Sequence, residues 1–177
     1  MSLPFSLNAA VLAAMYGATS GQSAQALRRL EVAYPVAMTY LAQAARQAEA
    51  GQDLRTYGGR LVQTGPAAPA SLAEPEALGA TAARGRYGRN AVIQGAAAEL
   101  FKMWAVTVRA RLAGLDARIV LCLHDELLIQ APQEHALTVA ELVARGLDQA
   151  VRRWAPGTPV RFVAEIAIIH RWSDAKG

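Results

Sequence analysis

Apolar residues recur along much of this chain at the three- and four-residue spacing of amphipathic helices. The longest such pattern runs from Arg84 to Leu112. Residues 36–49 and 137–154 repeat it over shorter lengths, with Gly51 closing the first of these two segments. Shorter helices are expected at 7–18 and 22–30, and Tyr34-Pro35 interrupts the pattern after them.

Short β-prone runs predict an antiparallel sheet. Arg118–Cys122 and Leu127–Gln130 are separated only by Leu123-His124-Asp125-Glu126, so they are expected to pair as a β-hairpin. Residues 56–60 predict a turn between shorter strands, and the alternation over 159–170 predicts a last strand.

The stretch 64–75 is rich in proline and alanine and is expected to be a surface loop. Taken together, the patterns predict an α+β fold in which a small antiparallel sheet packs against helices. No internal repeat or clear domain boundary is visible.

The composition allows a packed globule with a basic surface. The chain has 177 residues, of which 53% are hydrophobic, and a formal net charge of +4. Its only lysines are Lys102 and Lys176, so the cations are almost all arginine, whose planar fork suits phosphate groups. This balance is compatible with nucleic acid as a partner but does not establish one.

The cysteine count and the apolar runs bear on the compartment. The single cysteine, Cys122, lies in an apolar run and is expected to be buried. One cysteine excludes a disulfide framework and a cysteine metal cluster, which fits a reducing cytoplasm. No apolar run is judged long enough to cross a bilayer. The stretch Ala9–Ala18 lacks the basic start and cleavage site of a signal peptide.

Two adjacent carboxylates, Asp125 and Glu126, follow His124 on the tight turn of the predicted hairpin. The apolar flanks draw this turn toward the core, where ionised carboxylates are costly to bury without partners. A divalent cation would offset that cost, and magnesium prefers such oxygen ligands while leaving room for substrate phosphates. The alternative is a solvent-exposed acidic turn in which His124 is simply polar, because so short a motif also arises by chance.

Three segments taken in order are more specific than any one of them. Residues 119–127 read IVLCLHDEL, residues 86–99 read RYGRNAVIQGAAAE, and Met15-Tyr16-Gly17 lies near the start. They resemble, respectively, the third palm motif, the palm helix before it and the end of the fingers helix of family A DNA polymerases, the bacterial DNA polymerase I type. Tyr34-Pro35 and Gly59-Arg60 also lie where that family has such residues.

The resemblance holds from about Ala9 to Lys176. It implies part of a right-hand polymerase, with 1–177 as a single C-terminal fragment. Residues from about 5 to 83 would be a fingers remnant and those from about 84 to 177 a palm portion. The implied activity is DNA-directed DNA polymerisation, in which a nucleotidyl group is transferred to a primer 3′ end in replication or repair.

The resemblance also implies a catalytic role for the hairpin turn. Asp125 and Glu126 would be the catalytic carboxylates and would bind the expected Mg²⁺, with Glu126 in a supporting role. His124 would lie beside the primer 3′ end and contact DNA. The implied partners are primer-template DNA and deoxynucleoside triphosphates, in the cytoplasm and without a membrane.

The other implied DNA contacts lie upstream. Asn90 and Gln94 would contact DNA near the new base pair, Arg86 would extend that row along the primer-template, and Arg60 and Tyr16 would contact backbone and template base. The spacing of the row independently places its members on one side of a helix, with a core face elsewhere. Without the resemblance, the row reads as a solvated helix face, Arg60 as a solvated turn arginine, and Tyr16 as a half-buried aromatic.

Two departures from the family pattern limit the expected activity. The cationic and aromatic residues that hold the nucleotide phosphates would fall on Pro4, Asn8 and Leu12, none of which matches. The first palm motif, a strand with another metal-binding aspartate, also has no counterpart. The remaining aspartates, in other contexts, are Asp53, Asp116, Asp148 and Asp174. Because two-metal catalysis needs both sides of its clamp, little or no activity is expected from the isolated chain.

Two other classes of function remain open. The chain could be a non-catalytic DNA-binding module that keeps Arg86, Asn90 and Gln94, or an interaction protein that inherited the fold. Self-association through apolar surface left uncovered by the missing polymerase parts is a further expectation.

Overall fold

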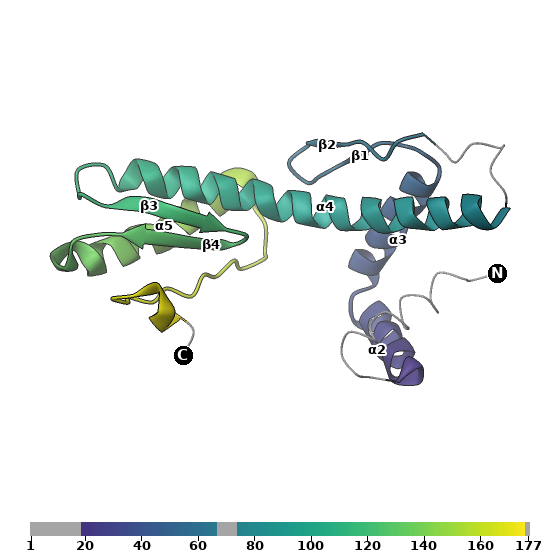
Figure 1. The fold of residues 1–177 in the computed structure, drawn as a ribbon, viewed down its shortest axis with the longest axis horizontal. Helices are drawn as coiled ribbons and strands as arrows, with labels where there is room; N and C mark the ends of the chain where they lie inside the picture. The colour runs from purple at the N-terminus through teal and green to yellow at the C-terminus, as the bar shows by residue number, and fades with distance from the viewer. Residues whose placement is uncertain (1–18, 67–73, 176–177) are drawn as a thin grey trace. The chain divides into compact units, whose positions relative to one another are not determined.

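The computed structural model of the chain describes residues 19–66 and 74–175 (Figure 1). It contains two compact units, residues 1–93 and 94–177, and the boundary between them falls within the long helix α4, Glu74–Arg111. The helix predicted at 7–18 and most of the loop predicted at 64–75 lie outside the described residues. Each unit has its own core, so each is described separately.

The first unit begins with two consecutive helices. Helix α2, Ser20–Ala33, starts with a capping box in which Thr19 and Gln22 satisfy each other's backbone N–H groups. Helix α3, Pro35–Glu49, follows directly, because proline at its first position is compatible with a helix start but not with continuation of α2. Tyr34-Pro35 therefore separates the two helices as predicted.

The rest of this unit is a short hairpin and the first part of α4. Strands β1, Leu54–Arg55, and β2, Leu61–Val62, pair in antiparallel register. The predicted turn over 56–60 is thus confirmed. The hydrophobic core of the unit comes from α3, the hairpin and α4 and consists of Ala44, Ala48, Leu54, Val62 and Val92.

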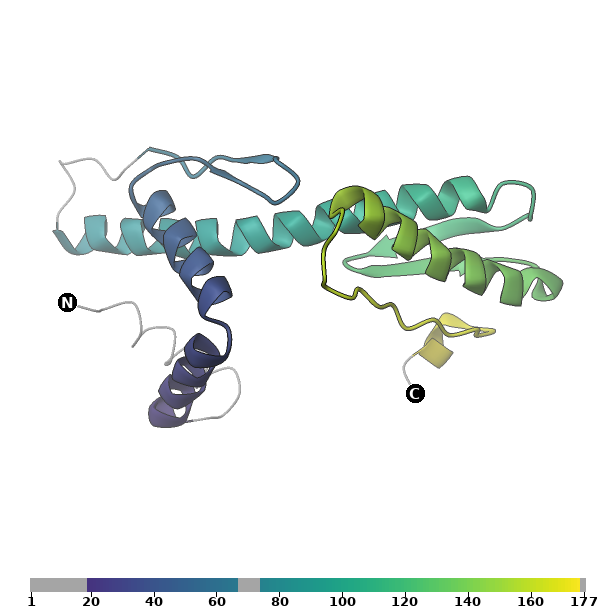
Figure 2. The same ribbon diagram turned by 180° about the vertical axis from the view of Figure 1, so that it is seen from behind.

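The second unit packs a hairpin and a helix against the later part of α4. Strands β3, Arg118–Leu123, and β4, Glu126–Gln130, pair antiparallel as predicted, and helix α5, Ala136–Trp154, follows a 3₁₀ turn at Gln133–His135 (Figure 2). Its core residues are Leu100, Trp104, Val108, Leu112, Val139, Val143, Leu147 and Ala150. The α+β class, with small antiparallel sheets among helices, is confirmed.

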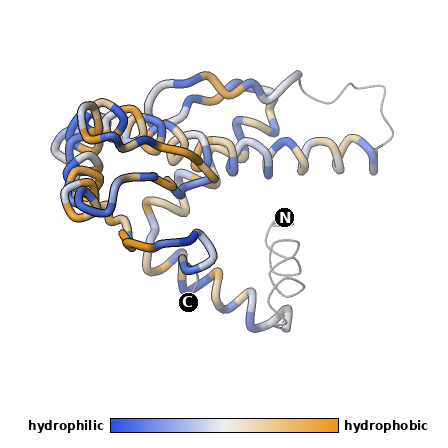
Figure 3. The backbone as a smooth tube through the Cα atoms, turned by 60° about the vertical axis from the view of Figure 1, so that its left-hand side comes forward, coloured by the Kyte–Doolittle hydropathy of each residue, from blue (hydrophilic) through white to orange (hydrophobic). Residues whose placement is uncertain are grey.

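The contact between α4 and α5 is fixed by one polar and one steric feature. The indole Nε1–H of Trp104 donates a 3.0 Å hydrogen bond to the Val143 carbonyl, so this buried donor is satisfied. Gly146 lets the helices approach, because a Cβ atom there would lie 2.9 Å from Cγ2 of Val108. Figure 3 shows apolar colouring over parts of the β3–β4 hairpin and of helix α5.

Three sequence-based expectations are corrected by the structure. Helix α4 already includes Glu74, ten residues before the predicted start, since Pro75 fits the first turn of a helix. Cys122 is exposed, not buried, because it lies one residue pair from the turn of a sheet that has only two strands. The segment 159–170 is extended but forms no strand, since it has no hydrogen-bonded neighbour among the described residues.

The sequence predicted that no apolar run is long enough to cross a bilayer, but helix α4 does not fit that expectation by length and composition. Residues Glu76–Arg111 are long and apolar enough to cross a membrane by those two measures alone. The same measures are met by core helices of globular proteins. Val92, Leu100 and Val108 of this helix are buried in the two protein cores, so packing explains these three apolar positions.

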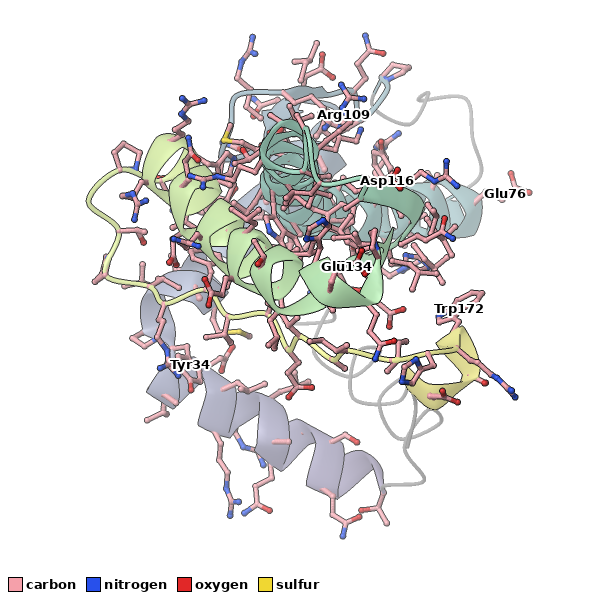
Figure 4. The ribbon with its side chains drawn as sticks, turned by 90° about the vertical axis from the view of Figure 1, so that its left-hand side faces the viewer. Tyr34, Glu76, Arg109, Asp116, Glu134 and Trp172 are labelled. Carbon is pink, nitrogen blue, oxygen red and sulfur yellow. The ribbon has the colours of Figure 1, made fainter. Side chains whose placement is uncertain are left out.

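Surface residues near the ends of the second unit can be followed in Figure 4. Arg109 lies in the last turn of α4, and Asp116 lies in the connection to β3 with a positive φ of 49°. Trp172, on the 3₁₀ turn Trp172–Ala175, is about half exposed.

Candidate nucleic-acid interface

Helix α4 presents the predicted polar row to solvent. Arg86, Asn90 and Gln94 are all exposed, and none of their side chains forms a hydrogen bond or ion pair with another residue in the described part of the chain. Arg86 and Asn90 belong to the first unit and Gln94 to the second. The side chains are therefore available to an external partner.

The opposite side of α4 is committed to packing in the first unit. Gly88 is buried against α3, and a Cβ atom there would lie 2.5 Å from Cβ of Ala48 and 2.9 Å from Cδ1 of Leu54. Val92, one turn further, is buried in the same core. This packing fixes the rotation of the helix and so determines which side chains face outward.

The β1–β2 hairpin holds Arg60 in an ordered turn. The hydroxyl of Thr56 accepts a 3.0 Å hydrogen bond from the Arg60 backbone N–H, and the Arg60 carbonyl accepts one from the Thr56 N–H. Gly59 has a φ of 89°, which favours glycine at this position. Arg60 itself is exposed, as the sequence suggested.

A second arginine on this hairpin was not singled out from the sequence. Arg55 is exposed, and its Nη1 donates a 2.8 Å hydrogen bond to the Gly59 carbonyl. The signal in the sequence was its place five residues before Arg60, on the other arm of the predicted hairpin. The two arginines give this hairpin two positive charges.

Most of the net positive charge of the chain comes from the first unit. Residues 1–93 contain eight arginines and five carboxylates, an excess of three, whereas residues 94–177 have ten cationic and nine acidic side chains. Arg84, on α4, has a half-buried side chain whose Nη1 donates to the Pro66 carbonyl. Such an excess attracts polyanions.

The acidic turn lies between β3 and β4. Leu123 pairs with Glu126, so His124 and Asp125 form a two-residue loop. His124 has a φ of 50°, in the left-handed region that such loops require at one or both positions and that glycine or asparagine usually occupies. The local strain falls on the residue beside the first carboxylate.

The turn does not bury its carboxylates. His124, Asp125 and Glu126 are all exposed, so the desolvation cost that favoured a cation in the sequence argument is absent. The described residues contain no group of three or more His, Cys, Asp or Glu side chains placed to hold a metal ion. The two carboxylates have the oxygen donors that Mg²⁺ prefers, but they supply only part of a coordination shell.

The structure thus leaves the predicted residues in two groups. Arg60, Arg86 and Asn90 lie in the basic first unit, and Gln94 and the acidic turn lie in the second. Tyr16, together with Pro4, Asn8 and Leu12, lies outside the described residues.

The chain matches the family model for DNA polymerase family A over residues 2–174. This match covers nearly the whole sequence, so the chain belongs to DNA polymerase family A. The family membership inferred from the three motifs is confirmed.

Individual relatives agree with this assignment. The chain is 36% identical over 92 residues to the thermostable DNA polymerase I of a Thermus thermophilus strain, which covers 52% of this chain and 10% of that protein. It is 40% identical over 73 residues to DNA polymerase I of Geobacillus stearothermophilus, covering 40% of this chain and 8% of the relative. The chain thus spans about a tenth of the length of these relatives.

One solved structure shares the fold. The POL domain of Pol1 from M. smegmatis, in complex with DNA primer-template and dNTP, superposes with a TM-score of 0.64 at 24% sequence identity. The match covers 82% of this chain and 25% of that one. About three quarters of that polymerase chain therefore has no counterpart in these 177 residues.

Proposed function

We propose that this chain forms a DNA-contacting part of a DNA-directed DNA polymerase, which transfers nucleotides to a primer 3′ end. The observation that carries this proposal is the exposed row of Arg86, Asn90 and Gln94 on α4. Its side chains face solvent without partners in the described part of the chain. An arginine and two amides suit phosphate and sugar contacts, which position DNA without reading its sequence.

The charge distribution supports the same partner. The excess of three positive charges in residues 1–93 accompanies Arg86, Asn90 and Arg60 in one unit. Primer-template DNA is a polyanion whose binding releases counterions, so this unit would bind it more weakly as salt is added. The dNTP substrate and the cytoplasmic location belong to the same proposal.

A salt titration of Arg86→Ala tests the DNA contact. Fluorescence anisotropy with a labelled primer-template would give the binding constant at several salt concentrations. Losing one phosphate contact should lower the slope of log K against log salt by about 1. Arg145→Ala is the matched control, because Arg145 lies on α5 and is held by Glu141 at 3.0 Å. Equal effects of the two substitutions, or no binding at low salt, would refute the proposal.

The acidic turn is proposed to contribute to the metal site of the polymerase. Asp125 and Glu126 would supply oxygen ligands to Mg²⁺, and His124 would lie beside the primer 3′ end. The metal, when bound, would neutralise charge on the phosphates of the reacting nucleotide. Because two carboxylates make only part of a shell, the remaining ligands would come from outside these 177 residues.

The same reasoning predicts that the 177 residues alone do not polymerise DNA. The purified chain should not extend a primer with Mg²⁺ and all four dNTPs, whatever its affinity for DNA. The check is a gel-based primer extension assay, with Asp125→Ala as the background control. Extension well above the Asp125→Ala background would show that the chain holds a working active site.

A further inference from the structure

A groove between helices α4 and α5 in the second unit combines two arginines with a partly apolar wall. Its volume is about 410 Å³, which is in the range of small-molecule sites. The lining residues come from both helices: Val106, Thr107, Ala110, Arg111, Gln149 and Arg153. No acidic side chain is among them, and none of them belongs to the acidic turn or to the row of Arg86, Asn90 and Gln94.

Arg111 is held in place by a neutral partner. Its Nε and Nη2 atoms donate hydrogen bonds of 3.0 Å and 2.6 Å to the side-chain oxygen of Gln149 on α5. A guanidinium group can only donate, so the amide has to present its oxygen to Arg111. The NH₂ group of Gln149 and the Nη1 atom of Arg111 have no partner in the described part of the chain. The contact therefore orients the guanidinium group without neutralising its charge.

Arg153 adds a second positive charge, one helical turn after Gln149 on α5. Its side chain is exposed, and neither Arg111 nor Arg153 forms an ion pair in the described part of the chain. The groove thus has two positive charges and several unused hydrogen-bond donors. Such a site is complementary to an anion.

Arginines near helix ends have a common structural role, which does not account for this pair. The last turn of α4 contains Arg109 and Arg111, and that of α5 contains Arg152 and Arg153. The C-terminus of a helix carries about half a negative charge, so one arginine per helix is enough to offset it. Arg109 and Arg152 do not line the groove and can fill this role. Arg111 instead binds a side-chain amide of the other helix.

We propose that this groove binds a phosphate dianion, either as free phosphate or as the terminal phosphate of a small monoester. Two guanidinium groups balance its two charges, and their planar forks match the spacing of phosphate oxygens. Val106 and Ala110 leave apolar surface beside the arginines for the organic part of a monoester. DNA is disfavoured, because each backbone phosphate carries one charge and residues 94–177 have ten cationic and nine acidic side chains.

Isothermal titration calorimetry of the 177-residue chain tests this site. The probes are inorganic phosphate and adenosine monophosphate at about pH 7.5, where the second ionisation of a phosphate group, with a pKa of about 6, is nearly complete. Both should bind saturably with a dissociation constant of about 1 mM or lower, whereas adenosine, the neutral control, should not bind. Tighter binding of the monophosphate than of phosphate would identify a monoester as the ligand, and equal affinity would identify free phosphate.

Neighbouring arginines provide matched control variants. Arg111→Ala and Arg153→Ala should each weaken phosphate binding about tenfold or more, because each removes charge-assisted hydrogen bonds. Arg109→Ala and Arg152→Ala remove the same charge from the same helix turns but lie outside the groove, so they should weaken it less than about threefold. Urea unfolding verifies that each variant folds. If Arg111→Ala does not fold, Arg111→Lys replaces it, because lysine keeps the charge but loses the planar fork.

Four results would overturn the proposal. The first is no saturable binding of either anion up to about 10 mM, tenfold above the expected constant. The second is equal binding of adenosine. The third is an equal loss of affinity in the groove variants and their controls, which would indicate attraction to the general charge of the helix ends. The fourth is weaker primer-template binding by Arg153→Ala but not by Arg152→Ala, which would assign the groove to DNA. The Arg86→Ala titration does not involve this groove, so a failure here is distinguishable from a failure of the proposed function.

Discussion

His124 determines the path of the chain through the acidic turn. Its φ of 50° lies in a region that is open to asparagine and glycine but strained for most side chains. The strain has a local cause, because a two-residue loop between right-twisted strands needs at least one such residue. Histidine is, with asparagine and aspartate, among the non-glycine residues found most often in this region, so the loop tolerates it.

The strain predicts how the turn responds to substitution. His124→Val should lower the free energy of unfolding by about 1–2 kcal/mol more than His124→Asn, because a β-branched side chain is least tolerated at positive φ. Urea unfolding followed by tryptophan fluorescence measures this difference. His170 is the control, since it is exposed and does not have a positive φ. A Val–Asn difference of the same size at His170 would contradict the explanation.

At the scale of elements, the crossing of α3 and α4 depends on a residue without a side chain. Gly88 brings α4 against Ala48 and Leu54, the small core of the first unit. Gly88→Ala should destabilise this unit by about 1–3 kcal/mol, because two neighbours must move. Gly79→Ala on the same helix meets nothing within 4 Å and should stabilise by about 0.5–1 kcal/mol. Native-state amide hydrogen exchange of α3 measures both changes in stability. A change of the same sign for the two substitutions would contradict the packing explanation.

Elements with local signals were predictable from the sequence. Tyr34-Pro35 separated two helices, and the periodic positions Leu100, Trp104 and Val108 marked a buried helix face. The β3–β4 hairpin followed from two β-prone runs that are close together. The start of α4 was missed because Pro75, a helix breaker elsewhere, is tolerated in a first turn.

What the sequence could not predict depended on partners. Alternation in 159–170 predicted a strand, but a strand exists only when another backbone pairs with it. Cys122 looked buried because its neighbours are apolar, yet a two-stranded sheet leaves part of its surface open. At the candidate site, the row of Arg86, Asn90 and Gln94 and its exposure could be predicted from the sequence. The exposure of Asp125 and Glu126 could not.

At the scale of the whole molecule, the chain has two hydrophobic cores that share no residue. The core of the first unit consists of alanine, leucine and valine, whereas that of the second contains Trp104 and more leucine and valine side chains. Small cores supply less apolar burial and hence less stability. The first unit, which has most of the excess positive charge, is therefore expected to be the less stable of the two.

The distribution of aromatic residues allows this expectation to be measured. All three tryptophans, Trp104, Trp154 and Trp172, lie in the second unit, so selective tryptophan fluorescence reports on that unit alone. Gly88→Ala should leave the tryptophan transition in urea unchanged while amide exchange in α3 accelerates. Leu147→Ala should lower the stability measured by tryptophan by about 2–5 kcal/mol, because it opens a cavity among buried side chains of the second core.

Comparing the tryptophan transition with the amide exchange of α3 for each substitution decides whether the two cores unfold independently. If Leu147→Ala leaves exchange in α3 unchanged, the two cores unfold as separate cooperative units even though α4 contributes to both. If either substitution shifts both signals together, α4 couples the cores into one transition, and the two-unit description fails energetically. Independent units would also mean that the proposed DNA contacts of the first unit can be ordered by DNA without a change in the acidic hairpin, which repeating both measurements with bound primer-template would show.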